Sequence, residues 1–468
     1  MRSPLLSSLA ASTILLLNSH LALANQVNDL DSEIRLLITA QQLTGDAAHG
    51  VTVPSIHSAK AQLGMKLFYS RTLGGDGSTA CVSCHHPMLG GGDGLSLPIG
   101  VGSIDPELIG PNRRLKNNQM INVPRNAPTT FNIALWKKHM FHDGRIKKLD
   151  AYSIMTPDVA LNTDDALSGE NLVQAQARFP ITSAEEMRGD FMKAAMNQTL
   201  RRSISERLKQ NWEKSFRIAF DDYDSEAQHL ITEQNMSEAI ADYERSQLFV
   251  NTPWKAYVEG DTQAISEQAK RGAYIFFSSQ ESGGANCASC HSGDFFTNEQ
   301  FYNTAMPQIG KGKHKHEGDT DMDDQGCYLV TKKADDKYRF RTPSLLNVEV
   351  TGPWGHSGAY TSLEAVTKHM LNPKKAAKEY QRKQVTQPGI DFSKTHDNIE
   401  VLLSSNINVK PVASFTEQDV SDLVEFMKAL TDPCVKSREC LSPWIPAAQS
   451  NDPDGNMLHG LLKRGQRL

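Results

Sequence analysis

Cys81-Val82-Ser83-Cys84-His85 and Cys287-Ala288-Ser289-Cys290-His291 carry one pattern, Cys-x-x-Cys-His, twice in a chain of 468 residues. This pattern is typical of c-type haem attachment, in which both thiols form thioethers to the haem vinyl groups and the adjacent imidazole binds the iron from one face. A zinc site or a redox dithiol is the alternative, but neither explains the histidine beside each second cysteine. The sequence therefore predicts a redox protein with two covalent haem c groups, whose irons are bound by His85 and His291.

Similar sequence surrounds the two motifs, which suggests a weak internal repeat. Residues 63–69 and 268–277, which precede the motifs, have apolar side chains at helical spacing, and glycine-rich loops lie nearby. Strand signals are few. Further helices are predicted at 200–220, 237–251 and 416–430, the last with a capping box formed by Thr416 and Asp419. We expect a mainly α fold with long loops wrapped around two haems.

Charge and the N-terminus narrow the class of protein. The formal net charge is −5 and no basic stripe indicates a nucleic-acid partner. Arg2, the apolar run 5–17 and Ala22-Leu23-Ala24 are typical of a secretory signal peptide cleaved after Ala24, with an uncleaved anchor as the alternative. No later stretch approaches the ~20 apolar residues that span a bilayer. Export and thioether-bound haem together predict the periplasm.

The length allows two or three domains, and we place the main boundary near residues 230–255. The expected units are a signal peptide at 1–24, a first haem c domain at 25–240, a second at 241–445 and a tail at 446–468. The tail has little periodicity and is expected to be partly disordered.

The remaining cysteines and a polar stretch give local predictions. Cys434 and Cys440 are close in sequence and lie in an oxidising compartment, which predicts a disulfide. Cys327 is then an unpaired, buried thiol. The polar stretch 311–325 predicts a loop, in which His314 and His316 are expected to be solvated rather than metal ligands.

Three segments between Ser58 and Pro433 make the chain resemble the bacterial di-haem cytochrome c peroxidase family, which includes the MauG-like enzymes. They are Leu63-Gly64 through Phe68, Arg125–Asn132 with Phe141–Arg145, and Phe340–Val348 running into Thr351–Gly358. The resemblance implies two α-helical cytochrome c-like domains, often in a homodimer. It also implies that the N-terminal, peroxidatic haem reacts with H2O2 and that the C-terminal haem delivers electrons.

The resemblance assigns a second iron ligand to the C-terminal haem. The family places an axial methionine in the helix after its Pro-x-x-His-x-Gly turn, and Met370 stands at the matching position here, where MauG-like relatives have a tyrosine. A neutral thioether raises the potential of haem iron, which suits an electron acceptor. Core packing is the ordinary role of a helical methionine, and His369 is the competing ligand.

For the N-terminal haem the resemblance gives an open iron and an acid–base group. Classical members block this iron with a histidine after the motif, but no histidine occurs between His86 and His139. We therefore predict an open or water-bound iron in the resting oxidised enzyme, a departure from the classical pattern. Cleavage of peroxide needs a group that accepts and returns a proton. The family's glutamate matches Glu186, with Gln176 ten residues earlier to orient peroxide. A solvated carboxylate is the alternative, and Glu185 takes the role if the register slips.

One position departs from the family pattern. The family's tryptophan between the haems is replaced by His142, and an imidazole is a poorer one-electron relay than an indole. Trp136 and Trp354 are candidate substitutes. His142 is instead expected to bond a haem propionate or to be a buried structural histidine, and the family's electron route is in doubt.

The family also holds a calcium ion between its domains, and the matching positions are Asn126, Thr351 and Pro353. Side-chain and backbone carbonyl oxygens of this kind suit calcium. The alternative is that Asn126 caps a turn.

Three functions follow, in order of preference. The first is reduction of H2O2 to water with electrons from a small cytochrome c or a copper protein. The second is MauG-like oxidation of a tryptophan or tyrosine on a partner protein, which Met370 in place of tyrosine disfavours. The third is a non-enzymatic electron carrier, which needs a sixth ligand on the N-terminal haem that the sequence does not offer.

Overall fold

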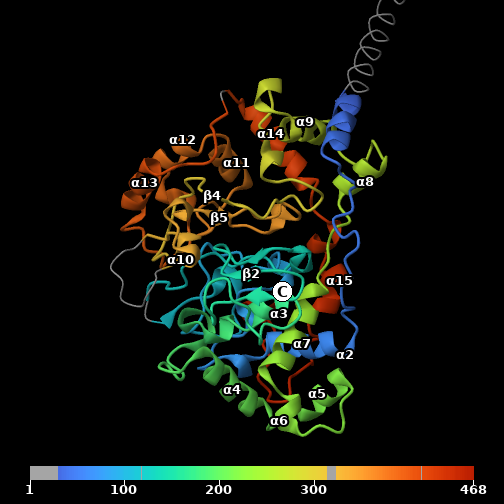
Figure 1. Cartoon of the computed structure of the whole chain (residues 1–468), viewed down its shortest axis with the longest axis vertical. Helices are drawn as coiled ribbons and strands as arrows, with labels where there is room; N and C mark the ends of the chain where they lie inside the picture. The colour runs from blue at the N-terminus through green and yellow to red at the C-terminus, as the bar shows by residue number, and fades with distance from the viewer. Residues whose placement is uncertain (1–29, 117–118, 314–322, 413) are drawn as a thin grey trace, which may run out of the picture.

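The computed structural model describes residues 30–116, 119–313, 323–412 and 414–468, and the expected signal peptide, His314 and His316 lie outside them. Helices predominate, joined by long loops and three small antiparallel sheets (Figure 1). Within the described ranges, no helix is long and apolar enough to cross a membrane. Residues 30–40 are also helical. The helices are α2 Ala59–Tyr69, α3 Leu172–Ala177, α4 Asn197–Leu208, α5 Glu213–Phe220, α6 Ala227–Leu230, α7 Glu233–Arg245, α8 Pro253–Glu259, α9 Glu267–Phe277, α10 Tyr328–Thr331, α11 Leu363–Leu371, α12 Pro373–Lys378, α13 Thr395–Ser404, α14 Glu417–Lys428 and α15 Arg438–Leu441. The strands are β1 His139–Met140, β2 Ile146–Lys148, β3 Ile154–Met155, β4 Phe301–Tyr302, β5 Phe340–Arg341, β6 Leu461–Lys463 and β7 Gln466–Arg467.

A first hydrophobic core forms where α2 crosses α7, next to the first Cys-x-x-Cys-His motif. Ser58 caps α2 by accepting a hydrogen bond from the backbone N–H of Ala61. Phe68 of α2 packs on Tyr243 of α7 with ring centroids 4.9 Å apart, and both side chains are buried. A Cβ atom at Gly64 would lie 1.8 Å from the carbonyl oxygen of α7 residue Ala239, so only glycine permits this close crossing.

A second core repeats the same construction around the second motif. Here α9 crosses α14, and a Cβ atom at Gly272 would lie 2.0 Å from the carbonyl oxygen of Asp422. Aromatic rings fill the crossing, with Phe276 and Trp254 each about 5 Å from Phe426. Each buried ring contributes roughly 1.5–3 kcal/mol to the free energy of folding. The weak sequence repeat thus corresponds to a repeated helix pair.

The two ends of the described chain cross between the cores. Helical residues 30–40 place Ile34 and Ile38 in the second core. This helical segment lies beside α8 and α9 in Figure 1. The tail does the reverse, because Met457 and Leu458 are buried in the first core. The expectation of a partly disordered tail is therefore wrong. Sequence periodicity does not reveal this order, because the tail is held by contacts with distant residues. One of them is the hydrogen bond of 2.8 Å from the Leu458 N–H to the carbonyl of Tyr69.

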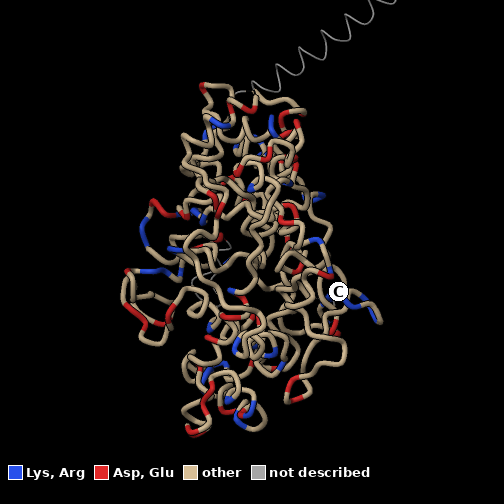
Figure 2. Tube along the Cα trace, turned by 90° about the vertical axis from the view of Figure 1, so that its right-hand side faces the viewer, with Lys and Arg blue, Asp and Glu red and all other residues tan. Residues whose placement is uncertain are grey.

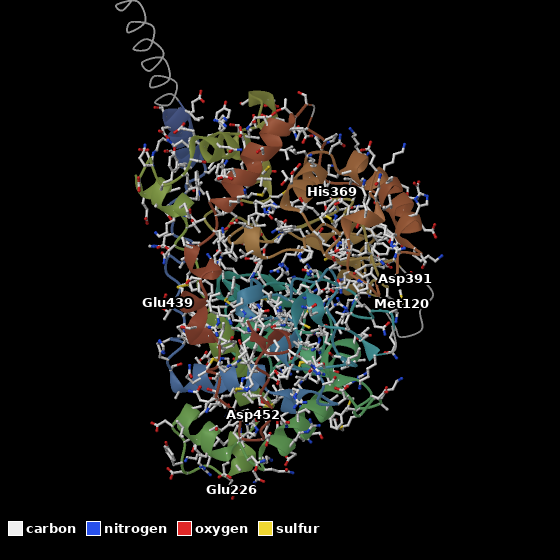
Figure 3. The ribbon with its side chains drawn as sticks, turned by 180° about the vertical axis from the view of Figure 1, so that it is seen from behind. Met120, Glu226, His369, Asp391, Glu439 and Asp452 are labelled. Carbon is white, nitrogen blue, oxygen red and sulfur yellow. A yellow bond between two sulfur atoms is a disulfide. The ribbon has the colours of Figure 1, made fainter. Side chains whose placement is uncertain are left out.

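Figure 3 shows the same reversal from behind, with Asp452 of the tail in the same half of the molecule as Glu226. The last residues form a hairpin of β6 and β7 that packs on residues 107–112 through the backbone of Leu461. Figure 2 shows that basic and acidic residues are interspersed along the described chain.

The structure confirms some of the local predictions and contradicts others. The capping box of Thr416 and Asp419 is confirmed at α14, and the Cys434–Cys440 disulfide is confirmed. Cys327 is a buried free thiol, as expected. The continuous helix predicted at 200–220 is wrong, because it is interrupted before the buried Trp212 and forms α4 and α5 instead. The helix predicted at 237–251 begins earlier and ends at Arg245.

Candidate functional site

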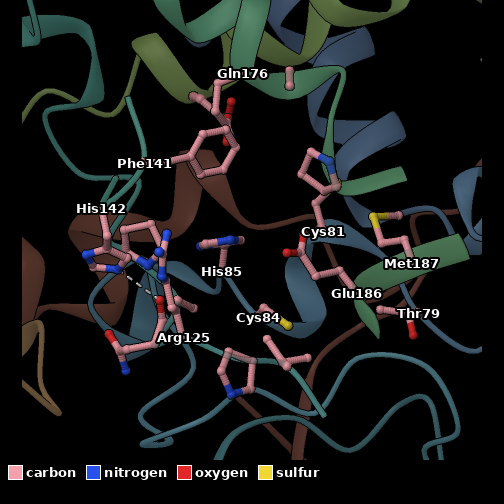
Figure 4. Close-up of a pocket in the computed structure, with 18 of the residues that line it drawn as sticks. Thr79, Cys81, Cys84, His85, Arg125, Phe141, His142, Gln176, Glu186 and Met187 are labelled. Carbon is pink, nitrogen blue, oxygen red and sulfur yellow. Dashed lines mark hydrogen bonds between the residues drawn. The ribbon is translucent and has the colours of Figure 1, made fainter. Parts of the chain in front are cut away.

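The first motif lies at a cavity between α2, α3 and α7. Cys81 begins a short 3-10 turn, and the Nδ1 atom of His85 lies 3.1 Å from the carbonyl oxygen of Gly91. This contact fixes the ring, so that the other nitrogen, Nε2, remains for an iron atom. Cys81, Cys84 and His85 all line the cavity (Figure 4).

The second motif lies at a larger cavity of about 770 Å³, lined by Cys287, Cys290 and His291. The Nδ1 atom of His291 lies 3.1 Å from the carbonyl oxygen of Phe296, the same arrangement as in the first motif. Met370 of α11 lines this cavity together with His291. The structure therefore places the predicted methionine ligand at the second motif.

His369, the competing ligand, is committed elsewhere. Its Nδ1 atom lies 2.9 Å from the hydroxyl of Tyr360, and its Nε2 atom lies 2.8 Å from the carbonyl oxygen of Thr304. Figure 3 shows His369 in the half of the molecule that contains α11 and α12. With both ring nitrogens in use, His369 has no atom left for iron, so this alternative is wrong.

The donor sets of both cavities fit haem c. Each supplies two thiols for thioether bonds and one imidazole whose Nδ1 is anchored to the backbone. The second cavity also has the volume of a typical cofactor site. The first is narrower, at about 100 Å³, so its fit rests on the donor set rather than on volume.

Glu186 reaches the first cavity from a single π-helical turn, Ala184–Arg188. Such turns are rare in proteins as a whole, but those that occur are often found at functional sites. Two glycine-containing segments hold the turn: the N–H of Gly75 donates to the carbonyl of Met187 at 2.8 Å, and a Cβ atom at Gly100 would lie 2.0 Å from the carbonyl oxygen of Glu185. Backbone packing on both sides therefore fixes the direction of Glu186.

Glu186 and its neighbour differ in surroundings. Glu186 lines the first cavity, and Glu185 is not among the lining residues. Burial raises the pKa of the Glu186 carboxyl, and the nearby cations Arg145 and Lys313 act against that rise. A carboxyl with a raised pKa can both accept and return a proton near neutral pH.

Gln176 lies at the end of α3, whose first turn is capped by the side chain of Asn171. It lines the first cavity, and Figure 4 shows Glu186 beside His85 and Gln176 farther away, beyond the ring of Phe141. The structure thus places at one cavity the two residues predicted to handle peroxide.

His142 borders both cavities. Its Nε2 atom lies 3.2 Å from the carbonyl oxygen of Asn126. Burial and the Arg125 charge lower the pKa of His142 to about 4, so the imidazole is neutral at pH 7. Trp136 and Trp354 line only the second of the two cavities. Of these three candidates, only His142 lies where it can contact groups in both.

An open iron at the first motif requires that no second histidine binds it. His85 and His142 are the histidines that line it. His86 points elsewhere: its Nδ1 atom accepts a hydrogen bond from the N–H of Met88 at 3.1 Å, and its ring lies against Gly460.

The three residues expected to bind calcium meet at the second cavity. Asn126, Thr351 and Pro353 all line it. The amide nitrogen of Asn126 donates to the carbonyl oxygens of Leu95 and Ser96 at 2.9 and 3.2 Å.

Sequence reasoning missed a buried charge network beside the first cavity. Arg125 donates two hydrogen bonds to Asp324, at 2.7 and 2.8 Å, and one to Asp143 at 2.7 Å. Arg145 donates to Asp143 at 3.1 Å, and Lys313 lines the first cavity with both arginines. The segments that resemble the family contain Arg125, Asp143 and Arg145. Their charged side chains were the signal from which the sequence could have indicated this network.

Comparisons with known proteins point to one family. Residues 58–263 match the family model described as di-haem cytochrome c peroxidase. The methylamine utilization protein MauG of Methylorubrum extorquens is 30% identical over 317 residues, which cover 67% of this chain and 68% of that protein. Cytochrome c551 peroxidase of Pseudomonas aeruginosa is 28% identical over 317 residues, covering 68% of this chain and 73% of that protein.

A solved structure shows the same fold. The crystal structure of the diheme peroxidase BthA from Burkholderia thailandensis superimposes with a TM-score of 0.55 at 18% identity, covering 88% of this chain and 93% of that one. The duplicated motif, the paired cavities and the curated relatives lead to one conclusion: the chain belongs to the di-haem cytochrome c peroxidase family, a family of haem-dependent oxidoreductases.

Proposed function

We propose that the protein is a periplasmic di-haem peroxidase that reduces H2O2 to two waters with two electrons and two protons. The electrons come from a small redox protein, either a cytochrome c or a copper protein, and pass from the second haem to the first. The observation that carries the proposal is the placement of Glu186 and Gln176 in the cavity of His85.

The residues of the first cavity divide the proton chemistry between them. Haem iron at His85 would supply the binding site for H2O2 and the electrons that break its O–O bond. The Gln176 amide orients peroxide by hydrogen bonding. The Glu186 carboxylate accepts the proton of the near oxygen and returns it to the departing oxygen, which leaves as water. Its fixed turn keeps the carboxylate in place for both transfers.

The second cavity suits electron storage. His291 and Met370 line it together, and a histidine–methionine ligand pair raises the potential of haem iron. A high potential makes the second haem a ready acceptor for donor electrons. His142, which borders both cavities, is the side chain we place on the route between the haems, in the neutral form.

Glu186→Gln tests the proton chemistry, and Glu185→Gln is a matched control one residue away. We expect Glu186→Gln to lower kcat for peroxide by about 10²–10⁴-fold, the usual contribution of a general acid–base group. Glu185→Gln should stay near wild type, because Glu185 does not line the cavity. Full turnover by Glu186→Gln would assign the proton transfers to another group.

The open first iron is tested without turnover. Resting-state EPR of the oxidised protein should show a high-spin ferric signal that disappears after one equivalent of H2O2. Two low-spin signals that do not respond to peroxide would contradict an open first haem and favour an electron carrier.

MauG-like oxidation of a protein side chain is the second candidate, because a protein named MauG is among the relatives at 30% identity. Met370 beside His291 weighs against it, since the resemblance gives MauG-like enzymes a tyrosine there. Turnover of H2O2 with a small redox protein as the only reductant separates the two functions.

The finer organisation belongs to the same proposal. We place two cytochrome c-like domains at 25–240 and 241–445, after a signal peptide at 1–24 and before the tail at 446–468. The chain ends cross these bounds, because Ile34 and Ile38 pack in the second core and Leu458 packs in the first. A calcium ion is proposed near Asn126, Thr351 and Pro353, supported by their common position at the second cavity. A homodimer completes the proposed assembly.

A further inference from the structure

Five charged side chains form one buried group beside the first cavity: Arg125, Asp143, Arg145, Lys313 and Asp324. Three of the five N–H groups of the Arg125 guanidinium donate to the two aspartates, one from each nitrogen. Arg145 uses one nitrogen, Nη1, for Asp143 and stacks on the ring of Phe141 at 3.4 Å from the centroid. The group therefore contains three cations and two carboxylates.

Lys313 carries the surplus positive charge. Within the part of the chain that the structure describes, its ammonium group has no ion pair or hydrogen bond. The Arg145 charge and burial lower the pKa of Lys313 to about 8. Its carboxylate neighbours are Asp143, which is already bonded to Arg125 and Arg145, and Glu186, whose pKa is raised by burial. A partly buried cation without an ion-pair partner is unfavourable. Lys313 and Arg145 both line the first cavity, so an anion in that cavity would complete the group.

The position of the group indicates which anion this is. A haem c carries its thioether-forming vinyl groups on one edge and its two propionates on the opposite edge. Figure 4 shows Cys81 and Cys84 on one side of His85, and Arg125 with His142 on the other. The charged group therefore lies on the side where the carboxylates of a haem attached at Cys81 and Cys84 would emerge.

We propose that Lys313 and Arg145 bind a propionate carboxylate of the first haem, and that Lys313 is a positioning residue for this haem. The proposal requires haem at His85 but does not require peroxidase activity. Lys313 and Asp324 lie after the second motif in the sequence, whereas Arg125 and Arg145 lie after the first. The first haem would thus be held by residues from both parts of the chain.

Resonance Raman spectroscopy of the holoprotein tests this contact directly, because the propionate bending band reports hydrogen bonding to the carboxylate. Lys313→Met should move the band of the first haem to lower frequency, and Lys313→Arg should keep it close to wild type. Lys311→Met is the control, since Lys311 is two residues away and does not line the cavity. If Lys313→Met fails to mature, Lys313→Gln replaces it with a side chain that keeps polarity without charge.

The reduction potential of the first haem provides a second readout. Lys313→Met should lower it, because a lost positive charge makes reduction less favourable, and Lys311→Met should leave it unchanged. An unchanged propionate band in Lys313→Met overturns the proposal, even if the potential falls, because the lysine would then act only through its charge. Neither measurement needs turnover. Absence of peroxide reduction by the wild-type protein would therefore contradict the proposed function and leave this contact intact.

Discussion

Replacing Asp324 with asparagine should destabilise the protein through the network that joins its two parts. The side chain of Asp324 is fully buried. It accepts two hydrogen bonds from Arg125, a third at 3.0 Å from the N–H of Gly326 and a fourth at 3.4 Å from the backbone N–H of Lys313. Asparagine has nearly the same shape, so Asp324→Asn removes the charge and one acceptor atom with little change in packing.

The magnitude follows from these contacts. A hydrogen bond to a charged group contributes about 1.5–3 kcal/mol, and breaking a buried ion pair costs about 3–5 kcal/mol because one charge is left uncompensated. Arg125 keeps its bond to Asp143, and the asparagine oxygen can still accept one bond. We therefore expect the lower end, a loss of about 3 kcal/mol in the free energy of unfolding.

Urea unfolding of the holoprotein, followed by circular dichroism, measures this loss as a lower midpoint at constant slope. Asp335→Asn is the control, because Asp335 is exposed, and surface changes of this kind usually alter stability by less than about 0.5 kcal/mol. A loss below about 1 kcal/mol for Asp324→Asn would refute the reasoning, since the buried pair would then contribute little more than a surface one.

Three further outcomes are expected. Met370→Leu should abolish the sulfur-to-iron charge-transfer band of the oxidised second haem, whereas an unchanged spectrum would remove Met370 as a ligand. Replacing Cys434 and Cys440 with serine opens a disulfide that spans six residues and should cost about 2 kcal/mol in urea unfolding; equal midpoints would contradict this. Burial alone would raise the pKa values of Asp143 and Asp324, but neighbouring cations hold both below the usual range. Their stabilisation is complete above the unfolded value of about 4 and is lost as pH falls further, so unfolding free energy measured against pH should decline below about pH 4, and a flat profile there would argue against the network.

Local chemistry was predictable from the sequence where neighbouring residues decide it. Haem attachment depends on residues within one pentapeptide, and the capping box at α14 depends on Thr416 and Asp419, three residues apart. The disulfide closes a loop of a few residues. The family pattern extended this to Glu186 and Met370, which the structure places at their respective cavities.

Interactions between distant segments were not predictable. Periodicity at 200–220 is helical, but burial of Trp212 interrupts the helix, and periodicity does not report tertiary packing. The tail lacks a repeating pattern because it adds single side chains, such as Leu458, to a core built elsewhere. Arg125 and Asp324 are 199 residues apart, so no local signal could pair them. His369 was excluded as an iron ligand only by its contacts with Tyr360 and Thr304.

The crossed chain ends set an order of events during the proposed export. The N-terminal part of an exported chain crosses the membrane first, so Cys81 and Cys84 reach the periplasm before Met457 and Leu458, which close the first core. In that interval the α2–α7 pair lacks part of its hydrophobic cover. Haem attachment to the first motif can therefore take place on an open, incompletely packed chain, and arrival of the last residues then closes the core behind the attached cofactor.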